Sequence, residues 1–423
     1  MRKVLTVAIL CLVVLLSVSA ISVNHENEDH PFDSAPMLDR FFDLSDDGNL
    51  PAWNAYKISL LTISKGSPLY SWFGHSALVV ETPDHRRIAF DYGTFSFASD
   101  RFISNFVMGR LWFVCLSSSI DYRLEEFEEE GRGVSVVELP LTVAQKKAVI
   151  NFLNENTDRE HREYLYHHYK DNCATRLRDI IDRATKGNFK RWAQSQSGLT
   201  FRQQASRGLS TNRFVQWALE FLQSSVIDKQ ATLWDEMFLP EVLEKAVMEY
   251  FHVGNEVLLE GSAKSTVPDK PQSNILFSVI LGLVLSGAYI ALWFFDLERA
   301  GGIYRCVVCT IFGILGSILM FMMLFTNHDV TWYNENILIV NPFLLVVAVL
   351  SLFRGERVMR LTRTCFNVLF GQVLILIVLK LLLPGMFFQQ NWPVIITMGL
   401  FYLPNTLHPK RMLKDESRHN LII

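Results

Sequence analysis

The chain has 423 residues, half of them hydrophobic, and a formal net charge of −3. This charge balance leaves no broad basic excess, so nothing in it favours nucleic-acid binding. The sequence also contains no phosphate-binding loop, zinc-ligand spacing or glycine-rich cofactor fingerprint. Its apolar residues are unevenly distributed, and their distribution predicts an exported domain followed by a membrane domain.

The N-terminus has the pattern of a secretory signal peptide. Residues 1–20, MRKVLTVAILCLVVLLSVSA, have a basic start, an apolar stretch and a small-residue end. We expect cleavage after Ala20, with an uncleaved anchor as the alternative. Residues 21–260 are mixed and polar and are long enough for one sizeable exported domain. Residues 261–273, rich in Ser, Lys and Pro, are predicted to be a linker.

The first half of the exported domain is predicted to be a sheet and the second half mainly helical. Thr142 followed by Gln145 is a capping pattern that starts one helix, and the next helix begins near Cys173. Segments rich in β-branched or aromatic residues, bounded by turn formers, predict strands at 56–63, 75–81, 86–93, 110–118 and 134–140.

Two of these strands are predicted to form a hairpin that brings a histidine to a carboxylate. The turn ETPDH joins them, and centring it near Pro83 places His75 directly opposite Asp91 on one face of the sheet. A carboxylate beside an imidazole fixes the tautomer of the ring and raises its basicity. The pair is therefore a candidate for acid–base chemistry.

Cys173 lies in YKDNCATRLRDII, at the predicted first turn of a helix whose N-cap is Asp171 or Asn172. A helix N-terminus stabilises a thiolate, and its unpaired N–H groups, around Asn172 and Cys173, could hold an oxyanion. The pattern predicts a nucleophile. A structural cysteine is an equally favoured reading of the spacing, and a disulfide with Cys115 in an oxidising compartment is a further alternative.

The C-terminal part is predicted to be a bundle of about five membrane helices, followed by a cytoplasmic basic tail at 407–423. The loop FRGERVMRLTR and the tail are basic, whereas the loops TNHDVTWYNEN and PGMFFQQNWP contain no Lys or Arg. By the positive-inside rule the two basic segments are cytoplasmic and the other two face outward. The predicted spans, within residues 274–406, are 274–295, 303–325, 337–353, 365–383 and 391–406.

Polar residues cluster in the outward loop that follows the second span. We predict a substrate-binding role for them, because polar groups at such a depth are costly unless satisfied. The alternative is that they cap helix ends or bond to head groups and backbone. The cluster contains His328, Asp329, Asn334, Asn336 and Asn341.

Other polar or aromatic side chains have simpler expected roles. Trp332 and Tyr333 are expected to be interfacial anchors, and Lys380 to extend to the lipid head groups. His167 and His168 are expected to be a surface pair before a helix, although one of them could touch the site.

Taken together, the motifs FGHSALVV, FDYGTF and DNCATRLRD resemble the Lnb-type lipoprotein N-acyltransferases. The segments TFRQQASRGLS, DKQATLWDEMFLPEVL and TNHDVTWYNENILIVNPFLL extend this resemblance over nearly the whole mature chain. The exported domain is also similar to circularly permuted papain-like enzymes, in which the strand histidine precedes the helix cysteine. The resemblance therefore implies an α+β fold: a permuted papain-like domain, an antiparallel sheet with helices, followed by an all-α membrane bundle.

The resemblance also implies a reaction. Cys173 matches the position of the family's catalytic cysteine, and His75 matches that of its catalytic histidine. Asp91 matches the position of the third catalytic residue, which is often asparagine in the family. Cys173 would receive an acyl chain from a phospholipid as a thioester and pass it to the N-terminal amine of a diacylated lipoprotein, with His75 as acid and base. No metal or cofactor is required. The enzyme would lie in a bacterial inner membrane, with its catalytic domain on the periplasmic side.

Two rival functions remain from the sequence. An exported amidase or peptidase of the NlpC type, acting on cell-wall peptides, would use the same Cys and His residues but needs at most one membrane anchor. A non-catalytic membrane assembly or transport component would have a structural Cys173, and a disulfide between Cys173 and Cys115 would favour it.

Overall fold

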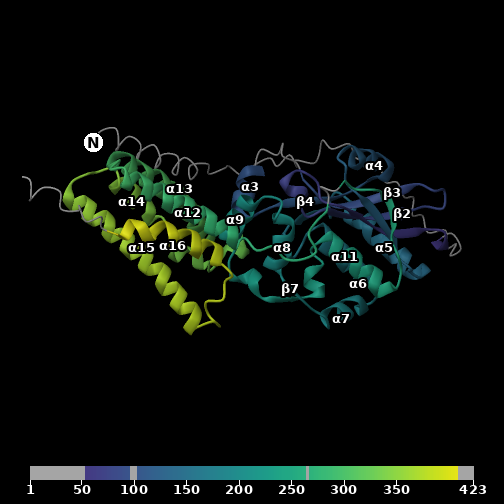
Figure 1. Cartoon of the computed structure of the whole chain (residues 1–423). Coiled ribbons are helices and arrows are strands. Elements are labelled where there is room, and N and C mark those ends of the chain that lie inside the picture. The colour runs from purple at the N-terminus through teal and green to yellow at the C-terminus, as the bar shows by residue number, and fades with distance from the viewer. Residues whose placement is uncertain (1–52, 96–101, 263–265, 408–423) are drawn as a thin grey trace, which may run out of the picture.

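In the computed structural model, residues 53–95, 102–262 and 266–407 are described, so the signal peptide and residues 408–423 of the predicted tail lie outside the described chain. A sheet-containing domain and a bundle of helices lie end to end (Figure 1). The C-terminal helices α12–α16 form the bundle, and the strands belong to the other part.

A seven-stranded antiparallel sheet is the centre of the N-terminal domain, and all five predicted strands belong to it. The sequence does not predict its two edge strands, β6 and β9, because they have only three and four residues. In spatial order the strands are β6 (Glu163–Leu165), β4 (Trp112–Ser119), β3 (Arg87–Thr94), β2 (His75–Glu81), β1 (Lys57–Ile63), β5 (Val134–Glu138) and β9 (Glu256–Leu259).

Helices cover both faces of the sheet. Successive residues of a strand point to opposite faces, and the central strands have apolar residues on both faces. On one face, Leu78 and Phe90 pack with Leu177 of α6 (Cys173–Ala184) in the main core. On the other face, Ala77 packs with Phe127 of α4 (Ile120–Glu129). The central strands are therefore held from both sides, and the side chains at their ends have fixed positions.

Several further helices of this domain follow α4 in the chain. The predicted capping box of Thr142 and Gln145 starts the first of them. They are α5 (Val143–Thr157), α7 (Asn188–Gln194), α8 (Phe201–Leu209), α9 (Arg213–Leu222), α10 (Leu233–Glu236) and α11 (Pro240–Phe251), with a small sheet of β7 (Ser197–Thr200) and β8 (Gln230–Thr232).

The bundle contains a helix for each of the five predicted spans, but in the described chain only α12, α13 and α15 are long and apolar enough to cross a membrane. The third predicted span contains an α-helix of only eight residues, α14, which a short 3-10 helix, η5 (Glu335–Leu338), precedes. The bundle helices are α12 (Ile275–Phe294), α13 (Glu298–Phe325), α14 (Phe343–Leu350), α15 (Glu356–Leu382) and α16 (Trp392–Thr406).

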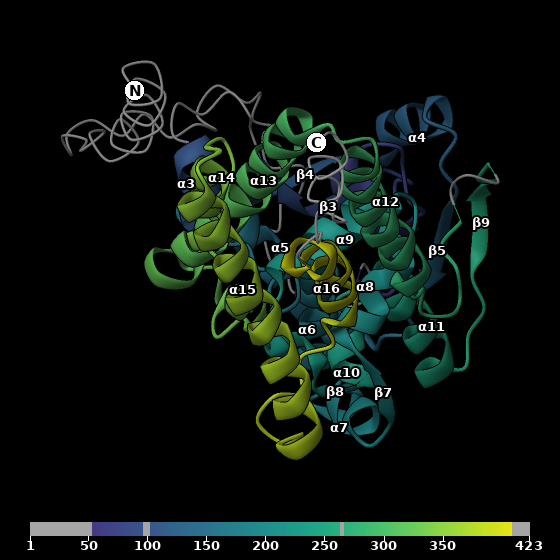
Figure 2. The same cartoon turned by 60° about the vertical axis from the view of Figure 1, so that its left-hand side comes forward.

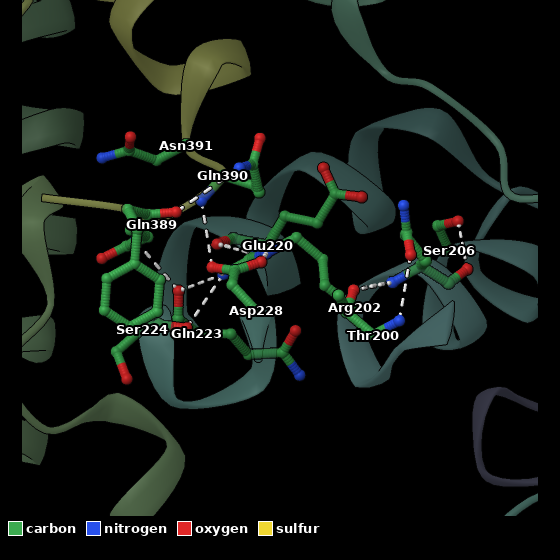
Figure 3. Close-up of polar contacts among 12 residues, drawn as sticks. Thr200, Arg202, Ser206, Glu220, Gln223, Ser224, Asp228, Gln389, Gln390 and Asn391 are labelled. Atoms are coloured by element: carbon green, nitrogen blue, oxygen red, sulfur yellow. Dashed lines mark hydrogen bonds and ion pairs between the residues drawn. The ribbon is translucent and has the colours of Figure 1, made fainter. Parts of the chain in front are cut away.

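A buried polar network joins the bundle to the N-terminal domain (Figure 3). The guanidinium of Arg202 donates to Asp228 at 2.6 and 3.1 Å and to backbone carbonyls that include that of Gln223. Asp228 in turn accepts from the backbone N–H of Gln390, and the side chain of Gln389 donates to Gln223. These contacts tie the loop before α16, which is predicted to face outward, to the N-terminal domain.

Lys380 does not extend to the lipid head groups, contrary to the expectation from its position in α15. Its ammonium donates to Glu335 at 2.5 Å and to the carbonyl of Gln389 at 2.7 Å, and the residue is only 8 % exposed. A charged partner and a carbonyl inside the bundle satisfy the cation where it stands. The residue therefore holds two outward loops together.

Candidate active site

Cys173 is the first residue of α6, and Asn172 is the N-cap that fixes this helix start. The Asn172 side chain accepts from the N–H of Thr175 at 2.9 Å, and the Thr175 hydroxyl accepts from the N–H of Asn172 at 2.7 Å. The Asn172 amide group also donates to the carbonyls of His168 and Phe238. All donors of Asn172 are thus engaged, so the expectation that it could hold an oxyanion is wrong, and its role is to anchor the turn.

The backbone N–H groups of Cys173 and Ala174 come before the first hydrogen bond within α6. The first intrahelical bond of α6 is donated by Arg176 to the carbonyl of Asn172, and the N–H of Thr175 is capped. The two preceding N–H groups therefore belong to the unsatisfied first turn of a helix, where negative charge is stabilised. Cys173 and Cys115 are both free thiols, so the disulfide alternative is not realised.

His75 and Asp91 are joined, although the predicted register of their hairpin is wrong by two residues. Ala77 stands opposite Asp91, because the turn is centred on Asp84 rather than on Pro83. A slip of two residues keeps each side chain on its face of the sheet. Nε2 of His75 therefore still reaches Oδ1 of Asp91, at 2.5 Å, along the diagonal of the strand pair.

Gly93 opens the end of the sheet where His75 and Cys173 meet. It has φ +105 and lies in an irregularity of β3 where the pairing with β4 shifts. A Cβ at this position would lie 3.7 Å from Cε1 of His75 and 3.8 Å from Cβ of Cys173. A residue without a side chain thus stands between the two groups, which come from a strand and from the helix on one face of the sheet.

Arg123, which the sequence analysis did not select, holds the far side of Asp91. It belongs to α4, and its guanidinium lies 3.0 Å from Oδ2 of Asp91. Burial opposes ionisation of Asp91, but the charges and hydrogen bonds of His75 and Arg123 outweigh it and lower the pKa of Asp91. Arg123 lies in the acidic run at residues 121–130, whose composition is typical of a solvated helix face, so the sequence gives no indication that this arginine contacts Asp91.

The electrostatics of the site favour a charged imidazole at His75. Burial alone would lower the pKa of His75, but the charges of Asp91 and Cys173 and a hydrogen bond to each raise it to about 10. Since Nε2 of His75 is bonded to Asp91, Nδ1 is the nitrogen left for the Cys173 thiol. The three side chains thus form a row in which the imidazole can give a proton to, or take one from, a group at the sulfur.

Tyr164 is the second residue that the sequence analysis missed. It lies on β6, is 5 % exposed, and its hydroxyl would be 4.0 Å from a Cβ on Gly93, beside His75 and Cys173. Its ring is held by Arg176, whose guanidinium carbon lies 4.1 Å from the ring centroid. Within the described residues the hydroxyl has no hydrogen-bond partner. This buried hydroxyl beside Cys173 is thus left free to bond to a bound group.

The predicted loop residues lie apart from this row and bond to the backbone of the chain. The amides of Asn334 and Asn336 both donate to the carbonyl of Phe221, and Asn341 accepts from the N–H of Phe343. His328 donates to the carbonyl of Phe106. These contacts fit the alternative reading, in which the residues satisfy backbone groups, and a substrate-binding role for them stays a prediction.

The outward loop nevertheless reaches the segment that leads into Cys173. Asp329 accepts from Nε2 of His167 at 2.8 Å and from Lys170 at 2.5 Å. Nδ1 of His167 accepts from backbone N–H groups, including that of Tyr169. His167 was expected to be a surface residue, but it is half-buried and bridges the N-terminal domain to the bundle. His168 is exposed, as expected. The two contacts place the start of α6 close to the outward end of the bundle.

No metal site is found near these residues. Among residues 53–95, 102–262 and 266–407, no group of three or more His, Cys, Asp or Glu could hold a metal ion. One hollow of the N-terminal domain is lined by Phe73, Gly74 and Glu241 but by neither His75 nor Cys173, so it is not the place where these two side chains meet.

Comparison with known protein families identifies both parts of the chain. Residues 52–207 match the model described as the Lnb N-terminal periplasmic domain, and residues 271–411 match the Lnb transmembrane domain. No curated protein and no solved structure gives a significant match. The chain therefore belongs to the Lnb family of bacterial membrane proteins, with a periplasmic N-terminal domain and a C-terminal transmembrane domain.

Proposed function

We propose that this protein is a thiol-dependent lipoprotein N-acyltransferase of the bacterial inner membrane. It would transfer a fatty acyl chain from a membrane phospholipid to the α-amine of a diacylated lipoprotein's N-terminal cysteine. Cys173 carries the acyl chain between the two substrates, and His75, oriented by Asp91, moves the protons. The ester of the phospholipid supplies the free energy, so no cofactor takes part.

In the first half-reaction the Cys173 thiolate attacks the ester carbonyl of the phospholipid. The negative oxygen that forms accepts hydrogen bonds from the N–H of Cys173 and from the hydroxyl of Tyr164. The ester C–O bond then breaks, and the His75 imidazolium gives its Nδ1 proton to the departing alkoxide. A lysophospholipid leaves, and the acyl chain remains on Cys173 as a thioester.

In the second half-reaction the lipoprotein amine attacks the thioester carbonyl. His75, now neutral, takes a proton from the amine nitrogen as the new C–N bond forms. The C–S bond breaks and returns the Cys173 thiolate, so that the imidazolium and thiolate are restored. The products are an amide on the lipoprotein and an enzyme ready for another phospholipid.

The observation that carries this proposal is the position of the nucleophile relative to the membrane domain. His75 begins β2, Gly93 is near the end of β3, and Cys173 begins α6, so the reacting groups gather at one end of the sheet. The bonds from Asp329 to His167 and Lys170 fasten that end to an outward loop of the bundle. A site in this place can take its acyl donor from the lipid itself and can keep water from the thioester.

The same position weighs against the rival amidase or peptidase. An enzyme acting on cell-wall peptides needs a nucleophile that is open to the periplasm, and it gains nothing from a membrane domain fastened beside the catalytic turn. The Cys and His chemistry is shared by both functions, so the substrate distinguishes them.

The test uses the full-length protein purified in detergent and mixed with phospholipid that carries a labelled acyl chain. We expect a label on the Cys173 peptide that hydroxylamine removes, because hydroxylamine cleaves thioesters. The label should be absent in Cys173→Ala and should form far more slowly in His75→Ala. Cys115→Ala is the matched control, since it removes the other free thiol of the described periplasmic domain and should keep the label.

A diacylated lipopeptide added afterwards should take up the label on its amine and leave Cys173 free. A reduced Cys173 that alkylating reagents modify, but that takes no acyl group, would contradict the proposal and favour the peptidase. A Cys173 that neither alkylates nor acylates would favour the non-catalytic alternative.

A further inference from the structure

An exposed apolar patch borders the membrane domain at the same end of the sheet. Its centre is α3 (Phe102–Met108), whose sequence FISNFVM contains no charged residue. Ile103 is 77 % exposed and Trp112, at the start of β4, is 52 % exposed. We call the following set of exposed residues the α3 patch: Ile103, Phe106, Val107, Trp112 and Leu165.

The members of the patch are brought together by local geometry. Ile103, Phe106 and Val107 follow the i, i+3, i+4 spacing that places side chains on one face of a helix. Trp112 stands opposite Leu165 in the pairing of β4 with the edge strand β6. Exposed apolar groups that gather in this way on a soluble domain mark a surface that contacts a partner or a membrane.

Two hydrogen bonds to backbone carbonyls of α3 hold it at the outward end of the helix α13. The carbonyl of Met108 accepts from the N–H of Asn327 at 2.9 Å, and that of Phe106 accepts from Nε2 of His328 at 2.9 Å. Asn327 follows directly on α13, a helix long and apolar enough to span a membrane, which ends at Phe325. Figure 1 shows α3 at the junction of the bundle and the sheet, whereas α4 lies at the far end of the domain.

We propose that the α3 patch rests in the outward leaflet of the lipid bilayer, so that the periplasmic domain is bound to the membrane surface beside the bundle. A short apolar helix at the end of a spanning helix lies at the boundary between head groups and acyl chains. Exposed Trp332 and Tyr333 lie on the loop that follows α13, and such aromatic residues favour that depth. Exposed Arg110 follows α3 and can meet the phosphate groups of the lipid.

The patch lies at the edge of the sheet that borders the candidate active site. The next residue after Trp112, Phe113, points to the other face of the strand. It stacks on Tyr166, with ring centroids 4.3 Å apart, and pairs with Tyr164 of β6. Tyr164 lies beside Gly93 and Cys173. Provided that the proposed acyl transfer holds, a phospholipid seated at the patch lies across the edge strand β6 from the nucleophile, and passage around this edge is its entry route.

The contact can be tested without any activity measurement. The full-length protein is reconstituted into vesicles of phosphatidylethanolamine and phosphatidylglycerol that contain a phospholipid with a photoactivatable diazirine in its acyl chain. After illumination, adducts are mapped by peptide mass spectrometry. We expect adducts on the peptide containing α3 and Trp112 as well as on the spans. The peptide of Tyr122, which is 72 % exposed on α4, should carry none.

Matched variants separate lipid contact from general folding. Ile103→Asp with Val107→Asp should lose the α3 adducts and keep those on the spans, because charged side chains leave the acyl region. Tyr122→Asp should change nothing, and Ile103→Leu should keep the label. Spans labelled without α3 in the wild type would overturn the proposal, as would cross-links joining the α3 patches of two protein copies, which would assign the surface to a dimer.

A second measurement distinguishes failure of the entry route from failure of the proposed reaction. The double variant should acylate Cys173 more slowly from phospholipid but at the wild-type rate from a short-chain, water-soluble ester. Equal loss with both donors would contradict the entry route. If the wild type uses neither donor, the proposed function fails, while the photolabelling still decides whether the patch contacts lipid.

Discussion

His75 and Asp91 are bonded at 2.5 Å although they do not stand opposite one another in the sheet. Ala77 occupies the position across from Asp91, and the continued register places His75 level with Gly93. The carboxylate thus approaches the ring diagonally and leaves the space directly across from His75 to a glycine, which admits Cys173. This relationship places the three side chains in the spatial order Asp91, His75, Cys173.

The first prediction concerns the pH dependence of acyl uptake. The pKa of His75 is raised from 6.5 to about 10, so the charged ring contributes stability fully below about pH 6.5, and this contribution is lost as the pH rises through about 10. Acyl uptake by Cys173 should fall over the same upper range, because a neutral ring cannot protonate the leaving alkoxide. Initial rates of lysophospholipid release as a function of pH measure this.

Asp91→Asn removes a negative charge that raises the pKa of His75. The alkaline fall of the rate should therefore move to lower pH. Asp121→Asn, at an exposed position of α4 paired with Arg87, is the control and should leave the profile in place. An Asp91→Asn profile that coincides with the wild type would show that Asp91 does not set the charge of His75.

The second prediction concerns Arg123 as a positioning residue. Arg123→Gln frees Oδ2 of Asp91, so we expect kcat to fall by about tenfold to a hundredfold, as when other groups that orient a reacting side chain are removed. The alkaline limb of the pH profile should shift as well, because the environment of Asp91 changes. Arg87→Gln breaks a neighbouring surface pair with Asp121 and should have neither effect. Unfolding measurements would show whether a lower rate reflects lost structure.

The third prediction concerns Gly93. Gly93→Ala should destabilise the protein by about 1–3 kcal/mol, because φ +105 is strained for any residue with a side chain. It should also abolish most of the acyl uptake, since its Cβ occupies the space between His75 and Cys173. Gly187, with φ +78 and no atom within 4 Å of a built Cβ, is the matched control. Gly187→Ala should lower stability and leave the rate unchanged; equal rates in the two variants would refute the role of Gly93.

The fourth prediction concerns the Tyr164 hydroxyl. Tyr164→Phe should lower kcat about a hundredfold with little change in KM, as expected for the loss of one oxyanion donor. Its stability should be unchanged or greater, because a buried hydroxyl without a partner is removed. Tyr92→Phe breaks the bond to Asn156 and should instead lower stability by about 1 kcal/mol and keep the rate. A fully active Tyr164→Phe would remove this residue from the mechanism.

Local patterns were sufficient for the five longer strands of the main sheet, for the start of α6 and for two of the proposed reacting residues, His75 and Cys173. Alternation of apolar residues identifies strands β1 to β5, and the polar residues before Cys173 identify the start of α6. Helix capping and strand alternation depend on neighbours within a few residues, so one sequence contains the information. The boundary between the exported domain and the apolar helices can be predicted for the same reason, because the prediction depends only on the length of each hydrophobic segment.

Tertiary structure decided what surrounds those residues. Arg123 and Tyr164 reach the site from α4 and from an edge strand of three residues, and neither has a local signal that points to His75 or Cys173. Lys380 has the sequence context of a residue near lipid, yet Glu335, 45 positions away, keeps it inside the bundle. Strands β1 to β5, the start of α6 and the candidate reactive groups could be predicted because they are local properties of the chain. Only the tertiary structure could decide which distant charges and hydroxyls meet there, since such contacts depend on strand register and helix packing over the whole chain.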